Sequence, residues 1–184
     1  MATERIHIIT DSTSDLPPEL LTRYPITVVP AFVNFDGDSY PDESGHLDRQ
    51  DFYQRLPTLR PSPTTSALSP GAAEEAIRRA LATSDHVILL SQSTKLGSGY
   101  TQMRMGASSF PADKVTLGDS LQIAMGYGWQ AIIGAETALQ TGSVEATLDA
   151  MARVRKTVRV YCALSTLEFL QRGGRVGWAQ ASIG

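Results

Sequence analysis

The chain has 184 residues, of which 42% are apolar, and its 16 Lys and Arg against 19 Asp and Glu give a net charge of −3. This charge gives no electrostatic reason to expect nucleic acid as a partner. The single cysteine, Cys162, excludes an intramolecular disulfide and a zinc site built on cysteine ligands. No apolar run approaches the roughly 20 residues of a membrane-spanning helix, so we expect a cytoplasmic protein rather than an integral membrane protein.

Apolar runs of strand type alternate with segments of helical type along most of the chain. Short runs rich in β-branched residues predict strands over 6–9, 26–35, 86–90, 114–117 and 158–164. Helical patterns and capping residues predict helices over 15–21, 48–56, 70–82, 100–109, 125–139, 143–156 and 166–171. Between them, the sequence predicts a tight turn at Asp36-Gly37, a polar loop over 38–45 and an extended segment over 60–70.

The alternation of strands and helices predicts an α/β fold, with a three-layer α/β/α domain and a mostly parallel sheet over residues 1–157. Residues 158–184 are interpreted as the beginning of a second, smaller α/β domain. They hold an apolar run, a short helix and the glycine pair Gly173-Gly174, followed by few further residues. We therefore expect the second domain to be incomplete in this chain.

Four of the predicted strands stop at a cluster of small hydroxyl residues, at 10–15, 91–94, 118–120 and 165–166. In an open parallel sheet, ligands bind in the crevice outside the carboxyl ends of the strands. If these strands are neighbours, their hydroxyls and backbone amides form one edge that holds a small anion or a carboxyl group. Such a site requires neither a metal ion nor a cofactor, and we predict neither.

The segment Gly118-Asp119-Ser120-Leu121 spells the signature of the GDSL esterases, in which the serine is the nucleophile. A serine nucleophile needs a base that accepts its proton. The chain offers His7 and His86 inside predicted strands and His46 in a loop, and no histidine follows Ser120. A serine hydrolase that acts through Ser120 is therefore the alternative function.

Short motifs follow one another in a fixed order along the chain. They are Thr10-Asp11-Ser12-Thr13 with Asp15-Leu16-Pro17, Val28-Val29-Pro30, Asp36-Gly37 with Tyr40, Pro63-Thr64-Thr65-Ser66, Ser91 to Tyr100, Asp119-Ser120, and Leu167 with Leu170-Gln171-Arg172-Gly173-Gly174-Arg175. Each motif alone has low specificity. In this order, and over the whole chain, they resemble the DegV family.

This resemblance implies a protein that binds a long-chain fatty acid and buries the acyl chain in its first domain. It also implies a partner, a separate fatty acid kinase, to which the protein presents the carboxylate for formation of the acyl phosphate. A protein of this kind is a binding protein and not an enzyme. It has no catalytic residues, and the bound fatty acid is its ligand rather than a cofactor.

The resemblance further implies that Thr65, a serine at a helix-entry turn, and Arg175 contact the carboxylate. The family usually reads Leu-Ser-Gly-Thr-Tyr at this turn, where the chain reads Leu96-Gly97-Ser98-Gly99-Tyr100. An ungapped alignment puts Gly97 in the serine position, and a shift of one residue puts Ser98 there. We favour Ser98, because a hydroxyl beside a helix N-terminus reaches a carboxylate bound there.

Neighbouring residues in the same motifs are further candidates for this contact, namely Ser66, Ser93 and Gly97. A polar edge above an apolar interior suits an amphiphile with one small head group, which agrees with the implied function. A purely structural or interaction domain is the third interpretation. The ligand content of the purified protein and its turnover of a generic ester distinguish the three.

Overall fold

The computed structural model of the chain describes residues 3–43 and 45–177. These residues form two compact units. The larger unit combines the N-terminal segment up to Ala31 with Ala67–Val160, and the smaller unit combines Phe32–Ser66 with the segment from Tyr161 onward. The division into domains at 1–157 and 158–184 is a different partition of the chain, and it stays a prediction.

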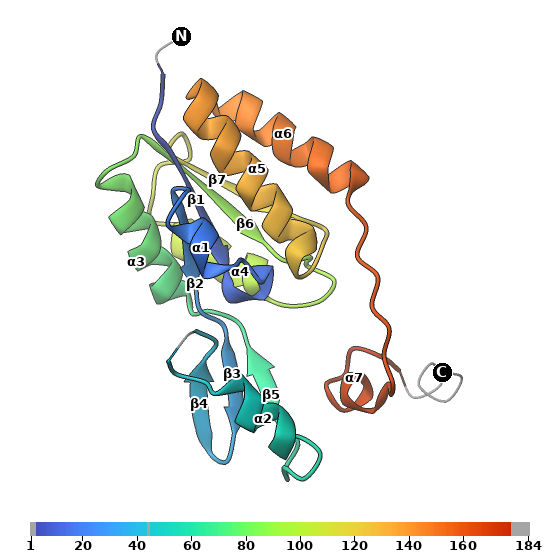
Figure 1. The fold of residues 1–184 in the computed structure, drawn as a ribbon. Helices are drawn as coiled ribbons and strands as arrows, with labels where there is room; N and C mark the ends of the chain where they lie inside the picture. The colour runs from blue at the N-terminus through green and yellow to red at the C-terminus, as the bar shows by residue number, and fades with distance from the viewer. Residues whose placement is uncertain (1–2, 44, 178–184) are drawn as a thin grey trace. The chain divides into compact units, whose positions relative to one another are not determined.

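The centre of the larger unit is a parallel sheet with the strand order β2-β1-β6-β7 (Figure 1). Its strands are β1 (Ile6–Asp11), β2 (Ile26–Val29), β6 (His86–Ser91) and β7 (Val115–Asp119). The central strands β1 and β6 are buried along almost their whole length. A strand covered on both faces reads as a continuous apolar run, which is why the sequence reveals both strands.

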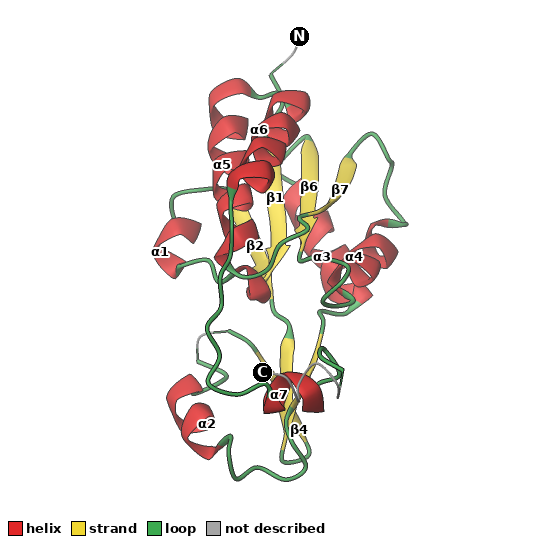
Figure 2. Cartoon of the chain, turned by 90° about the vertical axis from the view of Figure 1, so that its right-hand side faces the viewer, coloured by secondary structure: helices red, strands yellow, loops and turns green. Residues whose placement is uncertain are grey.

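Helices cover both faces of this sheet, with α3 (Pro70–Leu81) and α4 (Gly99–Ala107) on one face and α5 (Met125–Thr141) and α6 (Val144–Thr157) on the other (Figure 2). Successive residues of a strand point to opposite faces. Accordingly, Leu89 of β6 packs in the core beside α3 and α4, whereas Leu90 packs in the core beside α5 and α6. The predicted three-layer α/β/α arrangement with a mostly parallel sheet is confirmed.

Helix α5 lies close to its neighbours because it carries glycines at the points of contact. A Cβ atom at Gly128 would lie 2.6 Å from the carbonyl oxygen of Ser14, in the short 3-10 helix η1 (Ser12–Ser14) that precedes α1 (Pro18–Leu21). A Cβ atom at Gly134 would lie 2.8 Å from the sulfur of Met151 on α6. Larger residues at either position would push α5 away from η1 or from α6.

The smaller unit contains an antiparallel sheet with the strand order β4-β3-β5. Its elements are β3 (Phe32–Phe35), β4 (Asp38–Pro41), α2 (Arg49–Arg55), β5 (Thr64–Ser66) and α7 (Glu168–Arg172). Asp36 and Gly37 connect β3 to β4 with φ angles of 54° and 87°. Positive φ angles at both central residues are typical of the hairpin turn that Asp-Gly favours, so the predicted turn is confirmed.

The structure corrects the predicted strands in three regions. Residues 26–35 form two strands in different sheets, because Pro30 has no N–H to continue a ladder and ends the first one. The predicted polar loop at 38–45 begins with strand β4, which pairs with β3. Residues 158–164 form no strand, since no strand of the described residues pairs with them, and Tyr161 is 90% exposed.

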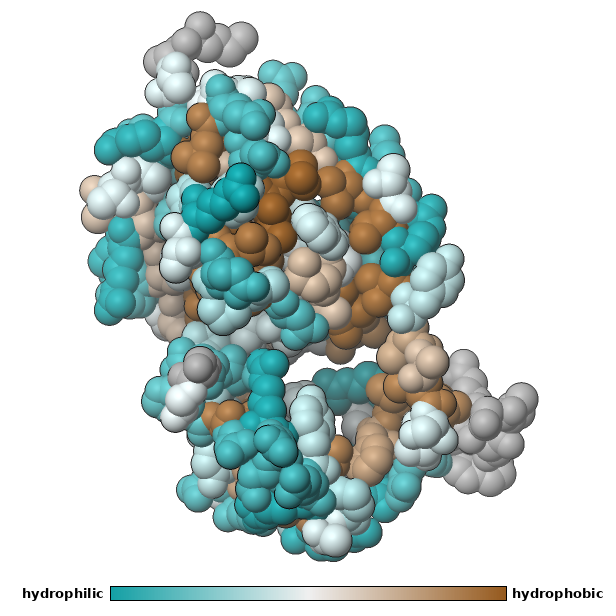
Figure 3. Space-filling view, viewed as in Figure 1, coloured by the Kyte–Doolittle hydropathy of each residue, from teal (hydrophilic) through white to brown (hydrophobic). Residues whose placement is uncertain are grey.

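Apolar surface of the larger unit gathers over the layer of α5 and α6, as the brown regions of the space-filling view show (Figure 3). Exposed apolar residues of this layer, and of the loop that precedes it, are Leu121, Ile123, Trp129 and Leu139. Single exposed apolar residues are ordinary on protein surfaces.

Candidate functional site

Three of the four predicted hydroxyl clusters meet at one edge of the larger unit. They follow β1, β6 and β7, which are parallel neighbours whose carboxyl ends lie together. The register places Ser91 of β6 opposite Asp119 of β7. The expected ligand edge of the sheet is therefore present. The fourth cluster, at 165–166, is not part of it, because its predicted strand does not form.

Several hydroxyls at this edge bind main-chain groups instead of facing outward. Ser14 Oγ donates to the carbonyl of Asp11 over 2.7 Å, and Ser91 Oγ donates to the carbonyl of Gln92 over 2.9 Å. Ser12 Oγ accepts the N–H of Ala31 over 3.0 Å. These three serines are buried. The expected row of hydroxyls available to a ligand is therefore much shorter than the sequence suggests.

The loop after β1 is closed by a buried network around Asp11. One carboxylate oxygen, Oδ1, accepts the N–H of Thr13 over 2.9 Å and the hydroxyl of Tyr127 over 2.7 Å. Burial and the adjacent Asp11 both raise the pKa of Tyr127. The other oxygen, Oδ2, is buried with no hydrogen-bond partner and lies 3.2 Å from the position of a Cβ atom at Gly99. This network ties α5 to the end of β1.

The loop between β6 and α4 is more open and carries three of the predicted contact residues. Ser93 is buried, and its Oγ accepts the N–H of Lys95 over 3.3 Å. Ser98 is exposed at the N-cap position of α4, and its side chain makes no capping bond. The first amides of α4 therefore lack a side-chain partner. An exposed hydroxyl beside free helix amides is an arrangement that binds carboxylates and phosphates.

Gly97 occupies a position with little free space. A Cβ atom there would lie 2.7 Å from Nε2 of Gln92, so any side chain at this position must displace the Gln92 amide. Of the two candidates for the family's serine position, Ser98 has an accessible hydroxyl in this chain, and Gly97 has only its backbone to offer. The assignment of the position itself stays a prediction.

The remaining predicted contact residues belong to the smaller unit. Thr65 and Ser66 are exposed on β5, where Ser66 Oγ accepts a hydrogen bond from Nδ2 of Asn34 over 3.3 Å. Arg175 follows α7, is exposed, and donates from its guanidinium to the carbonyl of Gly173. Arg172 of α7 donates to Ser62 Oγ over 2.9 Å, which connects α7 to the segment that leads into β5. A shared head-group site made of residues from both units stays a prediction.

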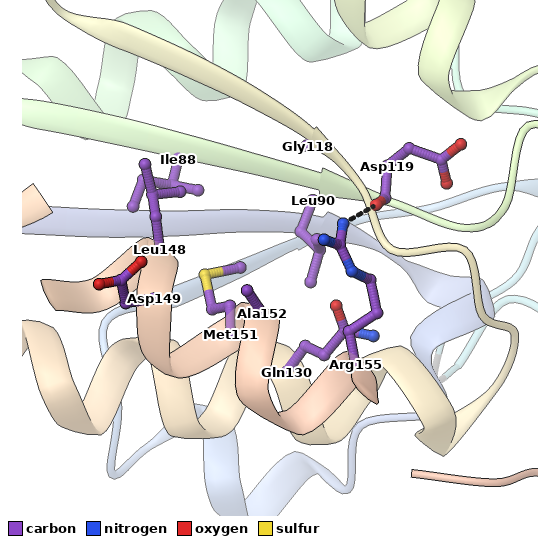
Figure 4. A pocket seen from close by; sticks show the side chains of 10 residues that line it. All are labelled: Ile88, Leu90, Gly118, Asp119, Gln130, Leu148, Asp149, Met151, Ala152 and Arg155. Atoms are coloured by element: carbon purple, nitrogen blue, oxygen red, sulfur yellow. Dashed lines mark hydrogen bonds between the residues drawn. The ribbon is translucent and has the colours of Figure 1, made fainter. Parts of the chain in front are cut away.

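A pocket of about 290 Å³ lies between the ends of β6 and β7 and helix α6 (Figure 4). Its lining is mixed and combines the apolar residues Ile88, Leu90, Leu148, Met151 and Ala152 with Asp119, Gln130, Asp149, Arg155 and Gly118. Arg155 donates from Nη1 to the carbonyl oxygen of Asp119 over 3.3 Å at the pocket rim. The pocket is amphipathic and adjoins the carboxyl edge of the sheet.

The surroundings of Ser120 do not support a serine hydrolase. Ser120 is fully buried, and its Oγ exchanges hydrogen bonds only with the backbone of Gln122, at 3.2 and 3.3 Å. The histidines of the larger unit, His7 and His86, lie near the opposite ends of their strands, where each ring nitrogen Nε2 bonds a threonine hydroxyl. Burial lowers the pKa of both histidines. Neither can serve Ser120 as a base.

The described residues contain no group of three or more His, Cys, Asp or Glu side chains that could hold a metal ion. None of their helices combines the length and the apolar character that crossing a membrane requires.

Sequence comparison identifies the family. The family model described as "Uncharacterised protein, DegV family" matches residues 5–184. The chain belongs to the DegV family. Curated DegV domain-containing proteins from Caldanaerobacter subterraneus, Deinococcus radiodurans and Streptomyces coelicolor are 30%, 33% and 34% identical over 97–98% of the chain. The chain spans 63–64% of the length of these relatives.

Solved structures of DegV proteins share the fold. The structure described as fatty acid binding of a DegV family protein from Thermus thermophilus is 37% identical, with a TM-score of 0.89, and covers 98% of this chain and 64% of that one. DegV of Bacillus subtilis, described as a fatty acid binding protein, is 28% identical, with a TM-score of 0.85 and the same coverage. Similarity to the Streptococcus pneumoniae Fatty Acid Kinase (Fak) B3 protein, at 15% identity and a TM-score of 0.82 over 97% of this chain and 64% of that one, concerns the fold alone.

Sequence reasoning missed the residues that connect the two loops of the DegV edge. The sequence indicates Asp119 only as part of short motifs and assigns it no role, yet its carboxylate accepts hydrogen bonds from Thr94 and Leu121. Arg155 and Gln130 were read only as parts of predicted helices. An acidic residue at the end of a strand, opposite a hydroxyl loop of the next strand, was the available signal for Asp119.

Proposed function

We propose that this chain binds a long-chain fatty acid and presents its carboxylate to a separate fatty acid kinase for acyl-phosphate formation. The observation that carries the proposal is the start of α4, where the exposed Ser98 hydroxyl and uncapped helix amides lie at the carboxyl edge of a parallel sheet. Helix N-termini favour negative charge through their free N–H groups and their dipole. Two relatives that match 98% of the chain and are described as fatty acid-binding support the same ligand.

The acyl chain supplies most of the binding energy in this proposal. Each buried methylene contributes about 0.8 kcal/mol, so sixteen carbons offer on the order of 10 kcal/mol before losses. The apolar residues that line the pocket beneath α6 suit such a chain. With about 290 Å³, the pocket is at the lower end of the roughly 300–1,000 Å³ of small-molecule sites, so it takes only a part of a long tail.

The head group then requires orientation more than affinity. We assign this role to Thr65, Ser98 and Arg175, with Ser66, Ser93 and Gly97 as further contacts. A guanidinium binds a carboxylate or phosphoryl group through two parallel bonds, which lysine cannot reproduce. Replacement of Arg175 by Lys should therefore lower acyl-phosphate formation with a fatty acid kinase while fatty acid binding is retained. Full acyl-phosphate formation by Arg175→Lys would contradict the assignment of Arg175.

No catalytic step is assigned to the chain itself. Its fully buried Ser120 has no base among the described residues of the larger unit. The proposed kinase partnership is supported by the motifs that the chain shares with the DegV family, and in this proposal the kinase transfers the phosphoryl group to the carboxylate that this chain presents.

Lipid extraction of the purified protein followed by mass spectrometry tests the proposal directly. We expect a co-purified long-chain fatty acid, or uptake of added labelled palmitate, and no hydrolysis of a generic ester. An empty protein that takes up neither palmitate nor oleate contradicts the proposed function. Ester turnover that disappears in Ser120→Ala would favour the hydrolase, and absence of both activities would favour an interaction domain.

A further inference from the structure

Asp119 is the last residue of β7 and lies between two loops of the ligand edge. The sheet register pairs it with Ser91, the last residue of β6. One loop leads from β6 to α4 and carries Ser93 and Ser98. The other, residues 120–124, leads from β7 to α5. A side chain at this position is therefore able to bind both loops at once.

The carboxylate of Asp119 uses both oxygens for this purpose. Oδ2 accepts the hydroxyl of Thr94 over 2.8 Å and the Thr94 N–H over 3.3 Å, and Oδ1 accepts the N–H of Leu121 over 2.8 Å. A backbone bond from Ser93 N to the carbonyl of Gln122, at 2.9 Å, connects the same two loops. The conformation of the β6–α4 loop thus depends on the β7–α5 loop, and Asp119 makes most of the side-chain contacts between them.

The β7–α5 loop has an unfavourable backbone conformation. Leu121 and Ala124 have φ angles of 54° and 53°, a region that residues with a Cβ atom rarely adopt. Such conformations persist only where surrounding contacts enforce them. The bond from Leu121 N to Asp119, together with the donation of Gln130 Nε2 to the carbonyl of Ser120 over 3.2 Å, provides such contacts.

The main chain of Asp119 belongs to the pocket as well. Its carbonyl oxygen accepts a hydrogen bond from Arg155 at the pocket rim, and Asp119 lines the pocket beside Leu90 and Ala152. Asp119 therefore contacts the β6–α4 loop through its side chain. It contacts the pocket through its backbone, where Figure 4 shows the bond to Arg155.

From this geometry we propose that Asp119 is a positioning residue, which holds the β6–α4 loop in the conformation that prefers a carboxylate over a neutral head group. The inference rests on the proposed fatty acid function and adds to it a residue that determines head-group selectivity. Asp119 itself does not contact the ligand. It acts through Thr94 and the loop that carries Ser93 and Ser98.

The variant Asp119→Asn tests the inference, because Thr94 and Leu121 bind different carboxylate oxygens and asparagine has an amide nitrogen, which cannot accept, in place of one of them. Positioning and simple electrostatics predict opposite results. Removal of a negative charge near an anionic ligand would strengthen palmitate binding, whereas loss of positioning weakens it. We expect palmitate affinity to fall about tenfold, the effect of losing one hydrogen bond to a charged group, and hexadecanol affinity to change by less than about twofold.

Thr94→Val removes the partner hydroxyl and should reproduce the same change in the palmitate-to-hexadecanol ratio. The double variant should be no worse than either single variant, because both remove one interaction. The matched control is Asp113→Asn, an exposed aspartate just before the other end of β7, which should leave the ratio unchanged. Thermal unfolding of each variant verifies that the fold is intact.

Amide hydrogen exchange provides a second measurement that needs no ligand. In Asp119→Asn, exchange at Thr94 and Leu121 should become faster, while exchange in α3 remains as in the wild type. An unchanged ratio together with unchanged exchange, or tighter palmitate binding by Asp119→Asn, overturns the inference. If the wild type binds neither palmitate nor hexadecanol, the proposed function fails, and the selectivity role of Asp119 fails with it.

Discussion

The loops that follow β1 and β6 have similar sequences, rich in serine and threonine, but opposite exposure. In the β1 loop, Ser12 and Ser14 are buried and bind the main chain, and Asp11 is enclosed by Thr13 and Tyr127. In the β6 loop, Thr94 and Ser98 are exposed at the start of α4. One loop is a structural connection, and the other has exposed side chains that a ligand can reach.

The difference in exposure depends on whether a helix packs against the loop and not on the sequence of the loop. Helix α5 reaches the β1 loop with Tyr127, and Gly128 brings its backbone close to Ser14. No helix of the larger unit covers Ser98 in this way, so its hydroxyl stays accessible. Composition predicts that such loops lie at the ligand edge of the sheet. Tertiary packing decides which of them is available.

The largest expected effect is on stability and comes from the closed loop. Replacing Asp11 by Ala removes the acceptor of Tyr127 and of the Thr13 N–H inside the core. Buried donors without partners are costly, so we expect a loss of about 3–4 kcal/mol in the free energy of unfolding. Urea denaturation measures it. Asp149→Ala, at an exposed position on α6, should stay within about 0.5 kcal/mol of the wild type. An equal effect of the two substitutions would contradict the structural role of the β1 loop.

Tyr127→Phe should have the next largest effect. It keeps the buried ring of α5 but removes the hydroxyl that donates to Asp11 and contacts Thr13 at 2.7 Å. We expect a loss of about 2 kcal/mol in stability, because Asp11 then loses a donor within the core. A double-mutant cycle with Asp11→Ala should show strong coupling. Additive losses would mean that the two side chains act independently.

The open loop should respond in the opposite manner. Ser98→Ala should leave the free energy of unfolding within about 0.5 kcal/mol of the wild type, because Ser98 makes no capping bond. Fatty acid affinity should fall by about 1–2 kcal/mol in binding free energy, since the carboxylate loses a donor. Titration with labelled palmitate measures this loss, and Thr65→Ala should behave likewise. A Ser98→Ala variant that is destabilised but binds palmitate with normal affinity would contradict this distinction between the two loops.

The smallest effect concerns His86, at the sheet edge opposite to both loops, and the pH dependence of stability. Burial lowers the pKa of His86 in the folded protein, so the unfolded chain binds more protons below about pH 6.5. Stability should therefore decline as the pH falls below this value, through the lowered pKa of the folded state. His86→Gln should show a shallower decline in urea denaturation between pH 7 and pH 5. If the stability of His86→Gln declines with pH as steeply as that of the wild type, His86 does not contribute to the decline.

The sequence was informative where one physical signal dominates. Long apolar runs revealed β1 and β6, and Asp36-Gly37 predicted the tight turn because few other pairs adopt positive φ angles at both residues. The sequence was misleading at 26–35, because the apolar run continues through Pro30, whereas the hydrogen bonding of the first strand ends there. It was misleading again at 158–164, because an apolar run becomes a strand only beside a partner strand.

The candidate site was predictable in part for the same reason. Motif order indicates Thr65, Ser98 and Arg175, which stay predictions, whereas the role proposed for Asp119 depends on which strands are neighbours. That information appears only when β7 is placed beside β6. The inward direction of Ser12 and Ser14 was equally hidden, since a hydroxyl residue has the same letter whether it binds a ligand or its own backbone.

The ladder between β3 and β5 has a consequence for how the chain can be rearranged. Phe32 pairs with Ser66, so the chain leaves the larger unit and returns to it through adjacent positions, roughly 5 Å apart between Cα atoms. Residues 32–66 are therefore an insert with its two ends side by side. A short glycine bridge from Ala31 to Ala67 can excise the insert without rethreading the parallel sheet, and a different segment can be grafted at the same junction.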